Sequence, residues 1–155
     1  RIVGMGSWKK GRGTLGPLDP LLGRWVAAAA KMPDGSVGDC SRDFTAFGAS
    51  FVRLDAAWNM GARGVYREHA FFGKGDDGAL AFWSFTIDGK RSAGILTDAS
   101  DVHSDAVAFV AEMAAGTARS VYWPDEDNVE GFRFAVESKA KNGWTRFLDH
   151  RYRPA

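Results

Sequence analysis

The last segment of the chain, residues 143–153, carries polar side chains that suit ligand recognition. In an extended strand the side chains alternate between two faces, so Arg146, His150 and Tyr152 share one face. Arginine supplies a permanent charge in a fork geometry that matches carboxylates and phosphates. This face therefore predicts a site for an anionic head group beside an apolar tail. The alternative, that these side chains lie on the wet side or at a barrel mouth, stays open.

A second polar pair lies in segment 63–72, where Arg67 and His69 share a face opposite Glu68. Facing each other across an interior, His69 and His150 would form an acid/base pair or two metal ligands. A metal needs a third ligand, and the sequence has no His-x-x-x-His or Cys-x-x-Cys motif. We therefore predict Arg67 and His69 as ligand contacts and predict no metal site.

Aromatic side chains are frequent, with 6 Trp and 11 Phe, and some of them can border a pocket for a flat or apolar molecule. We predict Trp83 and Tyr122 beside the ligand. Nucleophilic catalysis finds no support, because a Gly-x-Ser-x-Gly elbow is absent and Cys40 has no motif around it. We predict no catalytic residue.

The elements that position these residues read as short strands separated by turns. Asp88-Gly89 is a strong hairpin signal, and residues 73–78 form the clearest turn. Segment 104–113 fits a capped helix or a strand, and we favour a strand because both neighbours read as hairpin partners. The expected strands are 22–30, 37–47, 50–59, 63–72, 79–87, 91–98, 104–113, 118–124, 131–138 and 143–153.

This pattern predicts an all-β fold, an antiparallel up-and-down barrel of about ten strands, with a two-sheet sandwich as the alternative. Residues 1–16 are expected to form a flexible N-terminal arm, and residues 17–155 a single barrel domain. Residues 17–20 are expected to form a short turn or a helical turn that closes one end of the barrel. Several strands are apolar on both faces, which predicts that part of the outer wall is buried in a homodimer.

The bulk properties restrict partner and compartment. A net charge of +1 does not point to nucleic acid or to an anionic membrane, and no apolar run approaches the roughly 20 residues of a membrane span. The single cysteine, Cys40, rules out an internal disulfide and suits a reducing cytoplasm. Because the chain begins at Arg1, a processed or secreted form stays open.

One motif resembles a known superfamily. Leu22-Gly23-Arg24-Trp25 is similar to the Gly-x-Trp opening of calycins, which include lipocalins, fatty-acid-binding proteins and nitrobindin-like haem barrels. The glycine is expected to pass close to other backbone. The resemblance implies that Trp25 plugs the barrel end and that Arg151 or Arg153 packs over it. Over residues 20–153 the chain is most similar to an uncharacterised bacterial lipocalin-like family.

The functional ligands of these relatives do not transfer. Fatty-acid-binding proteins use Arg-x-Tyr on the last strand, whereas here Arg151 directly precedes Tyr152. The haem-ligating histidine of nitrobindin-like proteins has no match, because His150 lies too near the chain end. We therefore predict a non-catalytic binder of a small hydrophobic or amphipathic molecule, with no cofactor and with haem as a special case. The alternatives are an enzyme that uses His with Tyr or Glu, and a filled-barrel interaction module.

Overall fold

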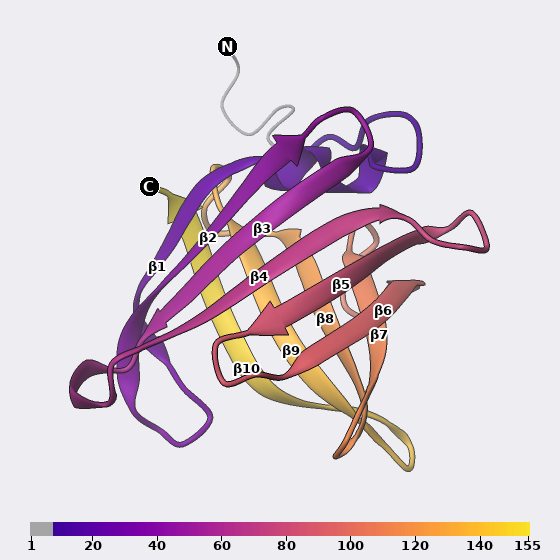
Figure 1. Cartoon of the computed structure of the whole chain (residues 1–155). Helices are drawn as coiled ribbons and strands as arrows, with labels where there is room; N and C mark the ends of the chain where they lie inside the picture. The colour runs from indigo at the N-terminus through magenta and orange to yellow at the C-terminus, as the bar shows by residue number, and fades with distance from the viewer. Residues whose placement is uncertain (1–7) are drawn as a thin grey trace.

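The structure, a computed structural model, describes residues 8–155 and consists almost entirely of antiparallel strands (Figure 1). Residues 1–7 of the predicted N-terminal arm lie outside the described part. The strands are β1 Gly23–Lys31, β2 Val37–Phe47, β3 Phe51–Asn59, β4 Val65–Lys74, β5 Leu80–Thr86, β6 Arg91–Thr97, β7 Val107–Met113, β8 Gly116–Pro124, β9 Phe132–Ala140 and β10 Gly143–Pro154. Two 3-10 helices complete the elements, η1 Gly16–Leu21 and η2 Gly61–Arg63.

The ten strands form a closed up-and-down barrel, as the sequence predicts. Each strand pairs with its neighbour in the chain, and β1 pairs with β10 to close the ring. Segment 104–113 is a strand rather than a helix, since β7 pairs with β6 and β8. Among the described residues no helix has the length and apolar character needed to cross a membrane.

One end of the barrel is covered by η1, which lies across it in Figure 1. Leu18 and Leu21 are completely buried there, and the indole Nε1 of Trp25 donates a hydrogen bond to the Leu21 carbonyl oxygen over 2.7 Å. Gly23 has a φ of 131°, a value that residues with a side chain rarely adopt, so this position requires a glycine. The expectation that Gly23 passes close to other backbone is wrong, because a Cβ there would meet only the Trp25 ring, at 3.7 Å.

Strands β7–β9 bury side chains on both of their faces, inside and outside the barrel. The inner layer is the main core, to which Phe44, Phe72 and Phe109 contribute. The outer layer is small and is covered by the β6–β7 connection, residues 98–106; its buried members are Ala99, Ala108, Val121, Trp123 and Ala135. The apolar outer face of these strands is therefore buried within the chain itself.

Candidate ligand-binding site

The interior holds a cavity between the buried core and the barrel end opposite η1. The space in it that is open to water-sized molecules measures about 190 Å³. One water needs only about 10–15 Å³ on this scale, so the cavity has room for a small organic molecule. Its apolar wall is formed by Leu54, Phe72, Phe82, Phe109, Val136 and Leu148.

Arg42 on β2 supplies the charge of this cavity. The alternation of β2 directs Cys40, Arg42 and Phe44 inward, and Arg42 is only 3% exposed. Its Nη2 donates a hydrogen bond to the Tyr122 hydroxyl over 2.6 Å, and its guanidinium carbon lies 4.1 Å from the Phe134 ring centroid. Burial alone lowers the pKa of Arg42, but the hydrogen bond to Tyr122 and the nearby Glu68 carboxylate raise it, so the side chain stays charged.

Several hydrogen-bond donors in this region have no partner among the described residues. They are Nε and Nη1 of Arg42 and the hydroxyl of Tyr152, all inaccessible to solvent. A buried polar group without a partner costs about 1–3 kcal/mol, and more when it is charged. Of these two residues only Arg42 lines the cavity, so its guanidinium suits a ligand that brings an acceptor.

Both tyrosines are neutral at physiological pH. Burial raises the pKa of Tyr122 and that of Tyr152, and Arg42 offsets only part of this effect. Because the Tyr122 oxygen already accepts from Arg42, its own proton is free to donate. The polar part of the cavity wall thus includes the Arg42 cation and the Tyr122 phenol.

A carboxylate is also present in the cavity wall. Glu68 on β4 lines it and accepts a short hydrogen bond from the Ser84 hydroxyl on β5. No ion pair joins Glu68 to Arg42 in the part of the chain that the structure describes. The Arg42 charge therefore lacks the direct carboxylate partner that buried arginines usually have.

The cavity reaches the barrel end that carries the β1–β2, β3–β4 and β5–β6 turns, because its lining extends to Trp58 and Met113 near the termini of β3 and β7. A second hollow at this end is lined by Met32, Asp34, Met60 and Tyr66 and shares Trp58 and Leu148 with the cavity. This end is therefore the opening, and Arg42 and Tyr122 lie deeper than the apolar residues that border it.

The structure brings three of the sequence-predicted ligand residues into the interior, namely Tyr122, His150 and Tyr152. Only Tyr122 lines the cavity; His150 and Tyr152 are buried in the core beside it. Three others, Arg67, His69 and Trp83, lie on the outer face, where the His69 ring contacts Asp55 at 3.5 Å. His69 and His150 therefore do not face each other across the interior.

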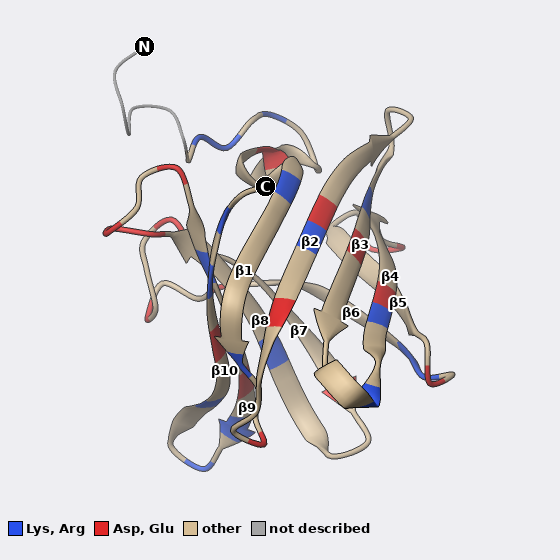
Figure 2. Ribbon diagram, turned by 90° about the vertical axis from the view of Figure 1, so that its left-hand side faces the viewer, with Lys and Arg blue, Asp and Glu red and all other residues tan. Residues whose placement is uncertain are grey.

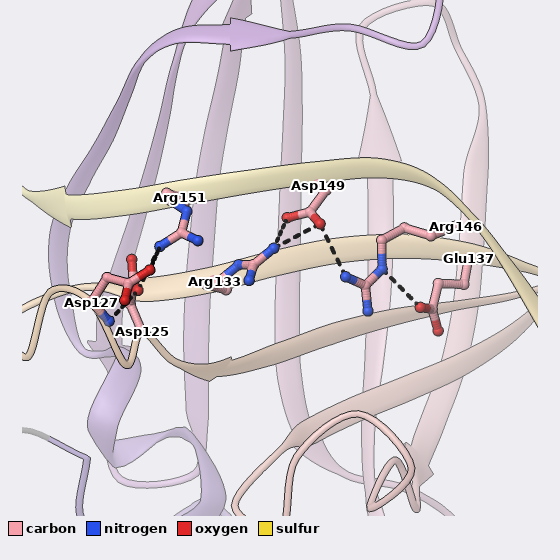
Figure 3. A network of polar contacts seen from close by, with 7 residues as sticks. All are labelled: Asp125, Asp127, Arg133, Glu137, Arg146, Asp149 and Arg151. Atoms are coloured by element: carbon pink, nitrogen blue, oxygen red, sulfur yellow. Dashed lines mark hydrogen bonds and ion pairs between the residues drawn. The ribbon is translucent and has the colours of Figure 1, made fainter.

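The prediction that Arg146 shares a face with His150 is wrong. The β9–β10 register shifts between Arg146 and Leu148, so a bulge at Phe147 turns Arg146 outward. Figure 3 shows Arg146 in an outer network, where it binds Glu137 and Asp149 over 3.0 Å each. Arg133 donates two hydrogen bonds to the same Asp149.

His150 lies at the seam between β1 and β10. This ladder is short, with Trp25 opposite Pro154 and Val26 opposite Arg153, and β1 then bulges at Ala29, whose φ is 51°. Beyond it, His150 Nε2 donates to the Lys31 carbonyl oxygen over 2.9 Å, which fixes the proton on Nε2. Burial, with a contribution from Arg42, lowers the pKa of His150, so the ring is neutral.

The predicted plug residues take separate positions. Trp25 packs edge-on against Phe132 at 4.9 Å between ring centroids. Arg151 binds Asp125 and Asp127, as Figure 3 shows, and Arg153 is exposed on β10 opposite Val26. Within the described range, residues 8–155, no group of three His, Cys, Asp or Glu side chains could hold a metal ion.

The residue that sequence reasoning missed is Arg42. A signal was available, because Arg42 falls in phase with Cys40 and Phe44 in segment 37–47, on the face that an alternating strand buries. When an arginine lies on the same face of a strand as apolar residues, either it belongs to a site inside the barrel or that face of the strand points outward.

Comparison with solved structures supports the barrel architecture. The chain is similar to the protein in the "Crystal Structure of Rv2717c from M. tuberculosis", with a TM-score of 0.60 and 14% sequence identity. The match covers 93% of this chain and 98% of that one. At this identity the similarity concerns the fold alone. No protein-family model matches the sequence, and no curated protein matches it significantly.

Proposed function

We propose that the protein is a calycin-like binder of a small amphipathic anion, held in the barrel interior without catalysis. The observation that carries this proposal is Arg42, a buried cation with two unpartnered donors on a cavity that is otherwise mostly apolar. A carboxylate bound beside the Arg42 guanidinium would give this buried cation the anionic acceptor that it lacks. The apolar part of the ligand would then lie along Phe72, Phe82 and Phe109, towards the opening.

The proposed ligand is not a haem. His150 is the histidine on the inner face of the described strands, and its Nε2 is engaged by the Lys31 carbonyl oxygen. His69 and His103 lie outside the barrel, paired with Asp55 and Glu126. A Soret band in protein loaded with haem would contradict this part of the proposal.

A matched pair of ligands tests the charge. Octanoate and octanol share an apolar chain, and calorimetry with the wild-type protein should show octanoate binding about 10–100-fold tighter, since a hydrogen bond to a charged group contributes about 1.5–3 kcal/mol. Native mass spectrometry of the protein as purified should show an added mass that disappears on denaturation. Equal affinity for octanoate and octanol would reject the proposal.

The control variant is Arg67→Met on the outer face. Arg67 is exposed, so this substitution should leave octanoate affinity unchanged, whereas Arg42→Met should reduce it to that of octanol. If Arg67→Met weakened binding as much as Arg42→Met, the ligand would lie outside the barrel.

We also propose that the chain forms a homodimer through the outer wall of β4–β6. Trp83, Phe85 and Ile95 are exposed there, and no connection of the described chain covers them as residues 98–106 cover β7–β9. Analytical ultracentrifugation should give a dimer that Phe85→Glu converts to a monomer. A monomeric wild-type protein at all concentrations would contradict this proposal.

A further inference from the structure

The two ends of the barrel differ in charge. We define the open end as residues 32–36, 60–64, 87–90, 114–115 and 141–142 with the strand residues that flank them, and the η1 end as residues 48–50, 75–79, 98–106 and 125–131 with theirs. The open end carries the basic residues Lys31, Arg63, Lys90, Arg91 and Lys141 and the acidic residues Asp34 and Asp88. The η1 end carries the basic residue Lys74 and the acidic residues Asp76, Asp77, Asp98, Asp101, Asp105, Asp125, Glu126, Asp127 and Glu130.

Local pairing leaves this difference in place. At the open end, Arg63 binds Asp34 at 2.7 Å and Lys90 binds Asp88 at 3.7 Å, and three cations remain in excess. At the η1 end, Arg151 binds Asp125 and Asp127, and Arg119 binds Asp101. Together with the basic residues of segment 8–16 they offset only part of the negative charge. Figure 2 shows blue segments at the β9–β10 turn at the bottom and red segments in the loops on the upper left. The net charge of +1 therefore conceals a strongly dipolar molecule.

Exposed apolar side chains surround the same opening. Val37, Val65 and Met113 are the open-end terminal residues of β2, β4 and β7, and Ile87 directly follows β5. Each is 46–64% exposed. The η1 end also exposes apolar residues, among them Val129 in an acidic loop. Only the open end combines exposed apolar side chains with excess positive charge.

We propose that the open end docks on the surface of a lipid bilayer that contains anionic head groups. Basic side chains near such a surface are attracted by its negative potential, at about fivefold in affinity per residue. The rim side chains Val37, Val65, Ile87 and Met113 would enter the boundary between head groups and acyl chains, as apolar faces of peripheral proteins do. The acidic η1 end would point away from the membrane, which fixes the orientation.

Docking in this orientation places the cavity opening against the lipid. An amphipathic anion could then pass between bilayer and barrel without crossing water, a consequence that rests on the proposed function. The docking itself does not require an occupied cavity, because it depends on the rim residues alone.

Cosedimentation with vesicles tests the proposal on the full chain. Binding is expected with vesicles of phosphatidylcholine and phosphatidylglycerol, and much less with phosphatidylcholine alone. It should be lost in about 1 M salt, where the Debye length is only about 3 Å. Equal binding to both vesicles, or no binding to either, would overturn the proposal, and the latter result would leave an acidic protein as the partner of this end.

Matched variants at the two ends locate the surface. Lys141→Glu should weaken binding to phosphatidylglycerol vesicles about 30-fold, since a reversal removes one favourable charge and adds one unfavourable charge. Lys74→Glu, the same substitution at the η1 end, should change it little. Ile87→Ser should also weaken binding, with Val129→Ser as its control. Similar effects at both ends would overturn the proposal.

A fluorescent label gives a readout that folding defects do not mimic. A bimane on Ile87→Cys should shift to the blue with phosphatidylglycerol vesicles, whereas a bimane on Val129→Cys should not. Cys40 will not compete for the label, because it is buried and burial raises the pKa of its thiol to about 11. Octanoate affinity of Lys141→Glu should equal that of the wild type, so failure of docking and failure of ligand binding give different results.

Discussion

Arg42 and Arg119 are equally buried, at 3% exposure each, but their surroundings differ in the groups that compensate the charge. Arg119, on the outer face of β8, donates to Glu137 over 2.7 Å and to both carboxylate oxygens of Asp101 over 3.0 and 2.6 Å. Arg42, on the inner face of β2, donates to one neutral phenol. Both guanidinium groups also lie near aromatic rings, so ring contacts do not distinguish them.

The difference separates a structural cation from a binding cation. The contacts of Arg119 are complete, and they attach the β6–β7 connection, through Asp101, to the outer wall of the barrel. The contacts of Arg42 are incomplete, and its side chain lines a cavity. A buried charge is tolerated when it is paired, and one left unpaired indicates a partner that arrives from outside the chain.

The largest expected effect comes from removing the structural cation. Arg119→Met should lower the free energy of unfolding by about 3–5 kcal/mol, because it leaves Glu137 buried with less compensation. Urea denaturation followed by circular dichroism measures this change. Arg133→Met, which breaks a more exposed pair with Asp149, is the control and should cost about 1 kcal/mol or less. Equal effects of the two substitutions would contradict the structural role of Arg119.

The binding cation should behave in the opposite way. Arg42→Met should leave the free energy of unfolding unchanged or raise it, because methionine fills the space without an unpaired charge. Its octanoate affinity should fall by the 10–100-fold expected for a lost charged hydrogen bond. The two denaturation curves, for Arg42→Met and Arg119→Met, test the comparison directly. A loss of stability in Arg42→Met as large as that in Arg119→Met would erase the distinction.

Substitutions of the two tyrosines near Arg42 test how much each hydroxyl contributes to stability. Tyr122→Phe removes the one hydrogen bond of Arg42 and should lower the free energy of unfolding by about 1–3 kcal/mol. Tyr152→Phe removes a hydroxyl that has no partner and should be close to neutral in the absence of ligand. Thermal denaturation of both variants measures the difference. A costly Tyr152→Phe would mean that its hydroxyl is bonded in solution.

The two regions should also lose stability in different pH ranges. Burial lowers the pKa of His150, so the unfolded chain binds this proton more readily, and stability falls as the pH drops below 6.5. Hydrogen bonds from Arg119 lower the pKa of Asp101, so its contribution is lost only below pH 3.8. His150→Gln keeps a hydrogen-bond donor for the Lys31 carbonyl oxygen but cannot titrate. It should therefore abolish the loss of stability below pH 6.5 and leave the loss below pH 3.8 unchanged. The denaturation midpoint of His150→Gln should be measured between pH 4 and 8, the range in which a histidine titrates. If the midpoint of this variant still falls with pH as it does in the wild type, another group is responsible for the pH dependence.

The barrel could be predicted from the sequence because the residues that determine each hairpin are close together in the chain. Alternating strands, Asp88-Gly89 and Asn142-Gly143 specify hairpins within a few residues, and all ten strands appear close to their predicted ranges. A bulge is not encoded in this way. One additional residue near Phe147 moved Arg146 to the outer face, and no composition signal separates it from a regular strand.

The site was harder to predict because it depends on contacts between distant strands. Arg42 and Tyr122 are 80 residues apart in the chain and meet only when the barrel closes. The choice of inner face on β4 also needed the closed barrel, since Arg67 and His69 alternate with Tyr66 and Glu68 and both sets are polar. Residues 98–106 gave no sign that they fold back over Val121 and Trp123.

The short β1–β10 ladder has a consequence for how the chain folds. Nine of the ten ladders join strands that are consecutive in the chain, and only this one joins its two ends. Hairpins can therefore form one after another during synthesis, at a small cost in loop entropy, while β1 keeps a free edge until β10 is made. The ring cannot close before Arg153 and Pro154 have left the ribosome, so the first strand to be synthesised waits longest for its second partner. A nascent chain that stalls in the last strand would expose this edge to other chains.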